Sequence, residues 1–367
     1  MGGQLAAQPS QRDKKGRFNA ASEDGRERMR LDETVIYMAC NWTANGGNLP
    51  RAECGSSACT MSVDSTNACA VCRTATVQEF DSPSPHYTLL RCTACGHVQV
   101  PTSAHMNNRV LQLGVFGEEF AERRGAFIEF YERISRDRAK RFLDLARPSR
   151  ILEVGPGSGS LMNHFAVMGH TVTGLDLSPA VAKQIRDRYG LQVVTTALEL
   201  YSSEAGDIYD AVIMRHVLEH FAEPLDAIRA AYALLRPGGV IYVAVPNMGS
   251  WHSRWRGWSG FEPYHLQYFW KGSLTQCLQD AGLTILKLGS YESLTGWTNT
   301  VLRSIVAPIR TTSDRGITEV KGGTMRNVFE FGRLIFGLLS SPLRWVQAGL
   351  YRGEELFAVA QRPDATR

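Results

Sequence analysis

The chain has 367 residues, of which 44% are hydrophobic, and its 40 Lys and Arg against 36 Asp and Glu give a formal net charge of +4. This length accommodates one large domain and a smaller one, and so small a charge gives no reason to expect nucleic acid or an anionic membrane as partner. No secretory signal is visible at the N-terminus, and no apolar run reaches the roughly 18 residues of a membrane span. We therefore expect a cytoplasmic protein.

The first 60 residues mix charged residues with Gly, Ser, Asn and Ala and show neither helical nor strand periodicity. Such a segment cannot bury a core, so residues 1–60 are predicted to be a disordered extension. Met61 is an alternative start for the folded part of the chain.

Four of the eight cysteines form two C-x-x-C pairs separated by 19 residues. They are Cys69, Cys72, Cys92 and Cys95. Four thiolates at this spacing predict a closed tetrahedral zinc site, and thus a zinc-ribbon domain at 61–105 whose metal is structural. The alternative is two redox-active pairs. His97 follows the second pair and is a possible substitute ligand, although four cysteines already suffice.

Residues 106–148 have helical composition and end at Pro148, and beyond them apolar strands alternate with helical segments. This alternation predicts an α/β fold with a Rossmann-like, doubly wound parallel sheet over 149–367. Strands are predicted at 151–154, 171–176, 191–195, 209–214, 240–246, 284–291 and 354–363, with an insertion at about 293–351.

A glycine-rich turn follows the first of these strands, in ILEVGPGSGS at 151–160. It lacks the Lys and hydroxyl of a P-loop, and its G-x-G-x-G spacing departs from the dinucleotide pattern G-x-G-x-x-G. Glu153 would repel a pyrophosphate but attract an ammonium group. Asp176 ends the next strand, where a carboxylate can accept both hydroxyls of a ribose. The alternative is a tight strand-to-helix turn that binds no ligand.

Four segments in order, ILEVGPGSG, LDLS, YDAVIMRHVLEHF and LLRPGGVIYVAVPN, resemble the successive motifs of class I S-adenosylmethionine-dependent methyltransferases, over roughly residues 130–290 and the last strand. The resemblance implies S-adenosylmethionine as cofactor, with the glycine turn around its methionine part, Asp176 at the ribose, and the loop after the third strand at the adenine. The usual acid of that loop is missing here. The implied cofactor residues are Glu153, Gly155, Gly157, Gly159, Asp176, Ala197 and Leu198.

Methyl transfer needs an aligned nucleophile and often a base that removes its proton. The absence of an N-P-P-Y motif after the fourth strand disfavours nucleobase N-methylation. His265 is our best candidate for the general base, because histidine titrates near working pH, with Tyr264 and His216 beside it. A structural role is the alternative for each histidine. The aromatic residues of segment 251–270 are expected either to cover the substrate or to pack in the core.

A zinc ribbon before such a domain resembles two families: nucleotide-sugar C-methyltransferases and ribosomal RNA guanine methyltransferases. The ribbon contains few basic residues, which favours the former. The sequence therefore predicts methyl transfer to oxygen or carbon of a small molecule, with a sugar nucleotide or glycan precursor favoured and no nucleic-acid partner. The alternatives are an RNA methyltransferase that recognises RNA through its zinc finger, and a non-catalytic cofactor-binding or scaffold protein.

The insertion at 293–351 contains a helical pattern with one apolar face, predicted to be flanked by Arg333 and Arg344 and interrupted at Pro342. The apolar face consists of Phe331, Ile335 and Leu338. Such a helix could rest on a membrane surface as a peripheral contact, or it could pack on the core or on a second subunit.

Overall fold

The computed structural model describes residues 68–74, 77–102, 105, 133–134, 143, 145, 148–206, 208–306 and 323–364. The predicted extension at 1–60 and most of the predicted helical lead-in at 106–148 lie outside these residues. The chain divides into two compact units, Met1–Asp64 and Ser65–Arg367, and every feature described below belongs to the second unit.

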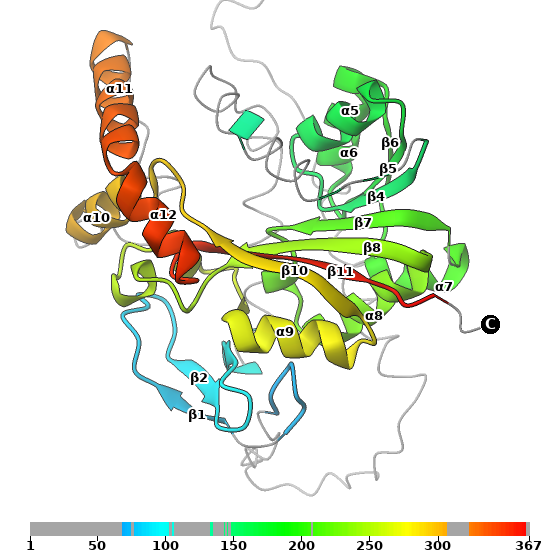
Figure 1. The fold of residues 1–367 in the computed structure, drawn as a ribbon, viewed down its shortest axis with the longest axis horizontal. Helices are drawn as coiled ribbons and strands as arrows, with labels where there is room; N and C mark the ends of the chain where they lie inside the picture. Colours follow the sequence, from blue (N-terminus) through cyan, green and yellow to red (C-terminus); the bar gives the residue numbers. More distant parts are fainter. Residues whose placement is uncertain are drawn as a thin grey trace, which may run out of the picture. The chain divides into compact units, whose positions relative to one another are not determined.

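A seven-stranded sheet forms the centre of this unit (Figure 1). Its strands are β4 (Arg150–Val154), β5 (Thr171–Leu175), β6 (Gln192–Val194), β7 (Tyr209–Arg215), β8 (Leu235–Pro246), β10 (Thr284–Tyr291) and β11 (Glu355–Gln361). The spatial order is β10-β11-β8-β7-β4-β5-β6. The strands from β6 to β8 are parallel, whereas β11 is antiparallel to both of its neighbours, so the sheet is mixed rather than wholly parallel. Because Tyr291 pairs with Glu355, the insertion between them leaves and rejoins the sheet at one edge.

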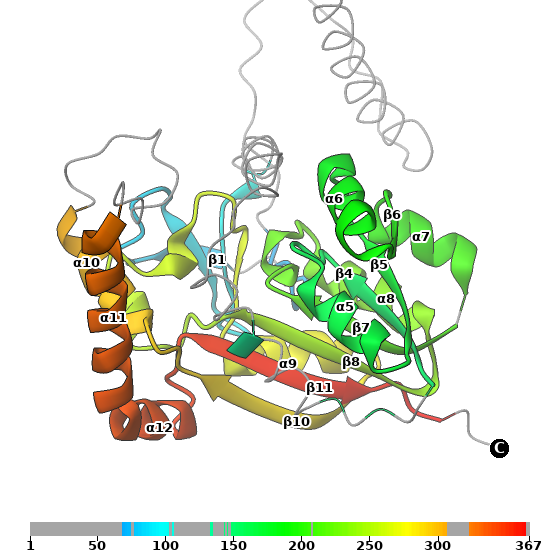
Figure 2. The same ribbon diagram turned by 90° about the horizontal axis from the view of Figure 1, so that it is seen from above.

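Helices cover both faces of the sheet (Figure 2). They are α5 (Ser160–Val167), α6 (Pro179–Tyr189), α7 (Leu198–Ala205), α8 (Pro224–Leu234) and α9 (Lys271–Asp280). Successive strand side chains point to opposite faces. Accordingly Ile151 packs with residues of α5 and α6, while Leu152 belongs to the core built with α8 and α9. Local signals delimit α6: Ser178 caps its start, Pro179 follows, and Gly190 ends it in the left-handed conformation.

The cysteine-rich segment forms a second, antiparallel sheet of β1 (Val77–Phe80), β2 (Leu89–Cys92), β3 (Val98–Gln99) and β9 (Gln267–Tyr268). Its last strand comes from the middle of the predicted methyltransferase domain. Cys69, Val71 and Cys92 also share a hydrophobic core with residues of α8 and α9. The ribbon is therefore joined to the larger domain through a strand and a core.

The insertion contains α10 (Gly296–Val306), α11 (Gly323–Leu339) and α12 (Ser341–Gly349). The prediction that Arg333 and Arg344 flank an apolar face is wrong. Arg333 is buried and donates to Asn299, and Arg344 donates to the carbonyls of Gly337 and Glu292, so both point into the protein. Exposed apolar side chains of this region are Ile305, Phe331, Ile335, Phe336, Leu338, Leu339, Leu343, Trp345, Val346 and Leu350. Among the described residues, no helix has the length and apolar character needed to cross a bilayer.

Candidate functional site

The glycine turn lies at the carboxyl end of β4, where three glycines adopt positive φ. A Cβ atom on Gly155 would lie 2.5 Å from the side chain of Val217, and one on Gly159 would lie 2.7 Å from Ile185. Neither position accepts a side chain without strain. The first contact also shows that the segment after β7 lies directly against the glycine turn.

Glu153 lies at the end of β4, shortly before the glycine turn, and one of its carboxylate oxygens lacks a hydrogen-bond partner within the described residues. That oxygen is Oε2, and the side chain is buried. Burial raises the pKa of Glu153 to about 7. A cationic ligand group would satisfy the orphaned oxygen and favour its ionised form. The site therefore fits the ammonium-bearing ligand that the sequence predicts.

The other predicted cofactor residues lie along the same edge of the sheet. Asp176 directly follows β5, and one of its oxygens accepts a hydrogen bond of 2.8 Å from the backbone N–H of Ser178. Burial raises the pKa of Asp176 to about 6. Ala197 precedes α7 and Leu198 begins it, although the side chain of Leu198 packs in the main core. Carboxyl ends of parallel strands are where ligands bind in open α/β sheets.

His216 follows β7 and has a φ of +54°, which is uncommon for a residue with a side chain. Its Nε2 lies 2.9 Å from Oε2 of Glu355, and its Nδ1 lies 3.5 Å from Oε1 of Glu219. Burial alone would lower the pKa of His216, but its contacts with the two carboxylates outweigh this and raise it to about 9. The ring is therefore protonated at neutral pH and is not a proton acceptor there.

His265 is buried, and its Nδ1 lies 2.8 Å from the carbonyl oxygen of Gly260. Burial, together with nearby His220, lowers the pKa of His265 to about 4. The ring is thus neutral at pH 7. Its neighbour Tyr264 stands at a right angle to it, with ring centroids 5.1 Å apart. The backbone oxygen of Tyr264 in turn lies 3.1 Å from Nδ1 of His220.

The aromatic segment at 251–270 contributes four rings to the core. Trp258, Phe261 and Tyr268 form one buried cluster with residues of β2 and β3, and Phe269 belongs to the main core. Within this segment, Trp255 and Trp270 are the tryptophans with the largest exposed fraction. Core packing, one of the two expectations, therefore accounts for half of these rings.

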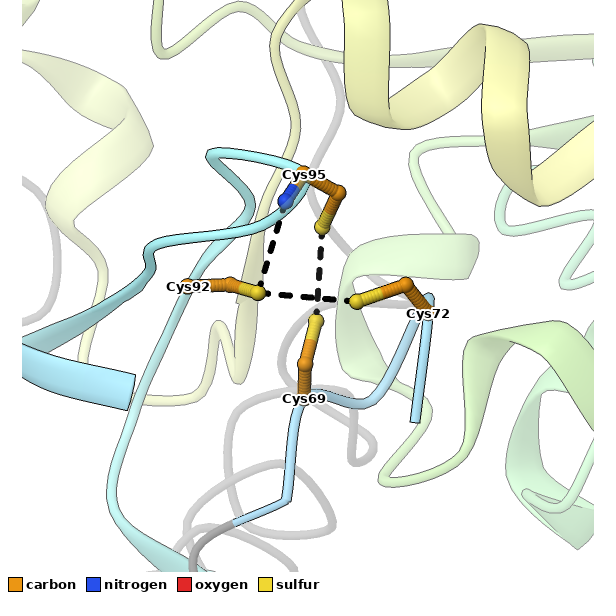
Figure 3. A group of neighbouring side chains, drawn as sticks. All are labelled: Cys69, Cys72, Cys92 and Cys95. Carbon is orange, nitrogen blue, oxygen red and sulfur yellow. Dashed lines mark hydrogen bonds between the residues drawn. The ribbon is translucent and has the colours of Figure 1, made fainter. Parts of the chain in front are cut away.

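The four cysteine sulfurs of the ribbon point toward one another (Figure 3). Sγ of Cys69 lies 3.5 Å from Sγ of Cys95, and the Cys72 and Cys92 sulfurs are equally close. All four ligand atoms lie within 4.8 Å of one another. Four ligands at about 2.3 Å from one zinc ion would be roughly 3.8 Å apart, so this donor set fits a tetrahedral zinc site. His97 lies outside it, with its Nε2 2.9 Å from Oε1 of Gln267.

Sequence reasoning missed three carboxylates at the carboxyl edge of the sheet. Glu219 and Glu355 contact His216, as described above. Glu292 is buried, and its Oε1 lies 2.8 Å from Nε2 of His252, while its Oε2 accepts hydrogen bonds from Gln347 and the backbone of Glu354. Burial raises the pKa of Glu292 to about 8. This second cluster joins β10, the loop after β8 and α12, and its contacts are those of a structural network.

The signal for Glu219 was present in the sequence as the Glu-His pair of RHVLEH, directly after a predicted strand. The more distant residues around it could not be inferred from spacing. His265 lies 46 residues further along, and Glu355 begins the last strand after the insertion.

The profile of a family described as "Methyltransferase domain" matches residues 123–288. This range contains the glycine turn, Asp176, His216 and His265. Together with the sheet order and the site at its carboxyl edge, the match shows that the chain carries a methyltransferase domain of the class I, Rossmann-like type.

Curated relatives are similar over a shorter stretch. A ubiquinone biosynthesis O-methyltransferase of Xanthomonas axonopodis pv. citri is 37% identical over 105 residues, which is 27% of this chain and 44% of the relative. The protein of the same name from Vibrio parahaemolyticus is 34% identical over 103 residues, again 27% of this chain and 44% of the relative. The chain thus spans less than half the length of these relatives. Among solved structures, a SAM-dependent methyltransferase from Archaeoglobus fulgidus is 16% identical with a TM-score of 0.44, covering 65% of this chain and 100% of that one.

Proposed function

We propose that the protein transfers a methyl group from S-adenosylmethionine to a hydroxyl oxygen of a small molecule. The observation that carries the proposal is the buried, orphaned Oε2 of Glu153 at the end of β4, shortly before three positive-φ glycines, with Asp176 directly after the neighbouring strand β5. Glu153 would bind the cofactor's ammonium group, and Asp176 its ribose hydroxyls. Ala197 and Leu198 would contact the adenine.

When bound, S-adenosylmethionine supplies a methyl group on a sulfonium: the sulfur–carbon bond breaks as the oxygen–carbon bond forms, leaving S-adenosylhomocysteine and a proton from the hydroxyl. The chain's task is to align the acceptor oxygen and accept or redirect that proton. We propose His265 as the residue that activates the acceptor, because it is neutral at pH 7 and the segment before it contacts His220. Tyr264 and protonated His216 would line the acceptor's position.

We also propose that Cys69, Cys72, Cys92 and Cys95 hold one structural zinc ion. Four protein ligands leave no open coordination position, so the metal would stabilise the ribbon rather than take part in the reaction. The ribbon in turn positions β9, because Val98 pairs with Tyr268 and Gln99 pairs with Gln267.

Two acceptor classes follow from different observations. A sugar nucleotide or glycan precursor is favoured because a cysteine ribbon before a methyltransferase domain resembles the nucleotide-sugar C-methyltransferases. The curated relatives instead carry a name tied to ubiquinone biosynthesis and to O-methylation, which supports oxygen as the methylated atom and a phenolic lipid as acceptor.

A structural observation favours the lipid-like acceptor. Leu339 and Trp345 are 77% and 80% exposed on α11 and α12, and the insertion that carries them begins and ends at the carboxyl edge of the sheet. We propose that this apolar surface rests on a lipid surface and brings the acceptor to the site.

The test is transfer of labelled methyl from S-adenosylmethionine to a panel of sugar nucleotides, phenolic lipids with and without vesicles, and structured RNA. Label on a small-molecule oxygen in wild type and its loss in Glu153→Gln would support the proposal. Label only on RNA, with binding that weakens steeply as salt increases, would replace it with the RNA alternative. A protein that binds the cofactor and methylates nothing would favour the scaffold alternative.

A further inference from the structure

The carboxylate of Glu219 is almost wholly buried, with 1% of its side chain exposed. Neither oxygen has a hydrogen-bond partner within the described residues. The closest cation is His216, whose Nδ1 lies 3.5 Å from Oε1, an ion-pair distance that is too long for a good hydrogen bond. A buried carboxylate with two unsatisfied oxygens is costly unless another group binds it.

His220 and His265 lie near this carboxylate, and the Nδ1 atom of each is close to a backbone carbonyl oxygen. The Nδ1 atom of His220 lies 3.1 Å from the Tyr264 carbonyl oxygen, and that of His265 lies 2.8 Å from the Gly260 carbonyl oxygen. A carbonyl only accepts, so in each ring it is Nδ1 that donates, and Nε2 is the nitrogen that would bind a cation. Imidazoles that bind metals are usually oriented by such a hydrogen bond from the other ring nitrogen.

The three ligand atoms, one each from Glu219, His220 and His265, lie within 4.8 Å of one another. Atoms at about 2.1 Å from one tetrahedral cation would be roughly 3.4 Å apart, so the site needs to contract by at most about 1.4 Å. The protein backbone supports this arrangement, because the N–H of Leu266 donates to the carbonyl of Glu219 at 2.9 Å. The N–H of Val100, at the end of the ribbon, donates to Leu266 in turn.

Charge also favours a cation here. Glu219 and Glu355 both contact His216, so two buried carboxylates share one imidazole here. The segment that carries Glu219 lies against the glycine turn through Val217, so a cation would sit beside the proposed cofactor site.

We infer that Glu219, His220 and His265 form a binding site for one divalent transition-metal cation, separate from the four-cysteine site. One carboxylate and two imidazoles suit borderline cations such as zinc or cobalt, whereas the cysteines suit a thiolate-bound zinc. Three protein ligands leave coordination positions for an acceptor oxygen. This inference rests on the proposed function and specifies how His265 activates the acceptor, as a ligand of the cation that binds and acidifies the hydroxyl.

The experiment is titration of the zinc-loaded protein with Co²⁺, followed by absorption spectroscopy and calorimetry. We expect one Co²⁺ per chain with the weak visible bands of nitrogen and oxygen ligands, because thiolate-bound Co²⁺ would give intense charge-transfer bands instead. Glu219→Gln and His265→Gln should each weaken binding by roughly 100-fold or more, since loss of even an outer-sphere partner costs about 10- to 100-fold. The matched control is Glu223→Gln, which removes an exposed carboxylate four residues away.

Two outcomes would overturn the inference. One is the absence of nitrogen- and oxygen-bound Co²⁺ from folded, zinc-loaded wild type. Another is unchanged Co²⁺ affinity in both variants, each shown to be folded by circular dichroism. Calorimetry with S-adenosylhomocysteine on the same samples separates this result from the proposed function: cofactor binding and methyl transfer without a second cation would leave the enzyme intact and make His265 the direct proton acceptor.

Discussion

The cofactor side and the acceptor side of the site are built in different ways. The cofactor side uses the ends of β4, β5 and β6, which follow one another along the chain. Glu153 lies near the end of β4, Asp176 directly follows β5, and Ala197 lies shortly after β6. The acceptor side brings together β3 of the ribbon, the Leu218–His220 turn, the segment before β9 and the start of β11. Local sequence therefore determines the cofactor side, whereas the acceptor side depends on long-range packing. Substitutions should affect one side without the other.

The largest expected effect comes from the ribbon. Replacing Cys72 and Cys95 by Ser should abolish zinc binding, since structural zinc contributes about 10 kcal/mol or more to small zinc domains. Because β3 holds β9, the acceptor side should lose order while the cofactor side keeps binding S-adenosylhomocysteine. Zinc analysis, hydrogen exchange at 264–268 and calorimetry measure these effects. The control is Cys277→Ala, a buried cysteine outside the four-sulfur cluster, which should retain its zinc. Equal loss of cofactor affinity and acceptor-side order would show that the two sides fold as one.

Glu153→Gln tests the cofactor side alone. Loss of a charged hydrogen-bond partner should weaken S-adenosylmethionine binding by roughly 1.5–3 kcal/mol, or on the order of 10- to 100-fold. Because burial raises the pKa of Glu153 from 4.5 to about 7, wild-type affinity should increase with pH up to about 7, as the carboxylate ionises.

The free energy of unfolding of the ligand-free protein should change with pH in the opposite direction to the cofactor affinity. A raised folded-state pKa means that the contribution of Glu153 to stability falls as pH rises from 4.5 through about 7. Glu153→Gln should flatten both pH profiles and melt no lower than wild type at neutral pH. Calorimetry and thermal melts across this range check the signs, and an affinity independent of pH in wild type would contradict the role given to Glu153.

Gly155→Ala tests the contact between the two sides. The new Cβ would meet Val217 at 2.5 Å and the residue would keep a φ of +63°, so we expect a loss of about 1–3 kcal/mol in the free energy of unfolding. Gly190→Ala is the matched control, because it has a φ of +67° but meets no atom within 4 Å. Equal destabilisation of the two variants in denaturant unfolding would mean that the contact with Val217 adds nothing to the backbone strain.

The smallest expected effect on stability comes from the insertion. Leu339→Ser and Trp345→Ser change exposed side chains, so the free energy of unfolding should stay within about 0.5 kcal/mol of wild type. Binding to lipid vesicles, measured by co-sedimentation, should nevertheless fall in both variants. Vesicle binding equal to that of wild type would contradict the proposed lipid contact, and a change of molar mass in solution would indicate a second copy of the chain on this face.

Much of the fold could be predicted because its signals are local. The seven strands and the helices between them follow from alternating apolar runs, and the glycine turn from residues at adjacent positions. The antiparallel β11 could not be read from its own sequence, because its direction depends on where the insertion returns to the sheet. The inward orientation of Arg333 and Arg344 escaped prediction for a similar reason: both bind acceptors outside their own helical turn, such as Asn299 and the carbonyl of Glu292.

The residues of the candidate site also divide into those with a local sequence signal and those brought together by long-range packing. Glu153, Asp176 and the cysteine cluster were identified by spacing and by position at the end of a strand. Glu219 and Glu355 were not, since their importance comes from His216, which lies between them only in the folded chain. His216 was predicted to be near the reaction, but its two carboxylate partners raise its pKa and change the role that it can play.

The most direct test of the central claim is calorimetric titration of the zinc-loaded protein with S-adenosylmethionine and S-adenosylhomocysteine, with metal analysis of the same sample. The account predicts one cofactor site per chain with micromolar affinity, corresponding to about −8 kcal/mol. Absence of binding to folded, zinc-loaded protein would mean that the glycine turn holds no such cofactor, and the methyltransferase function would have to be abandoned.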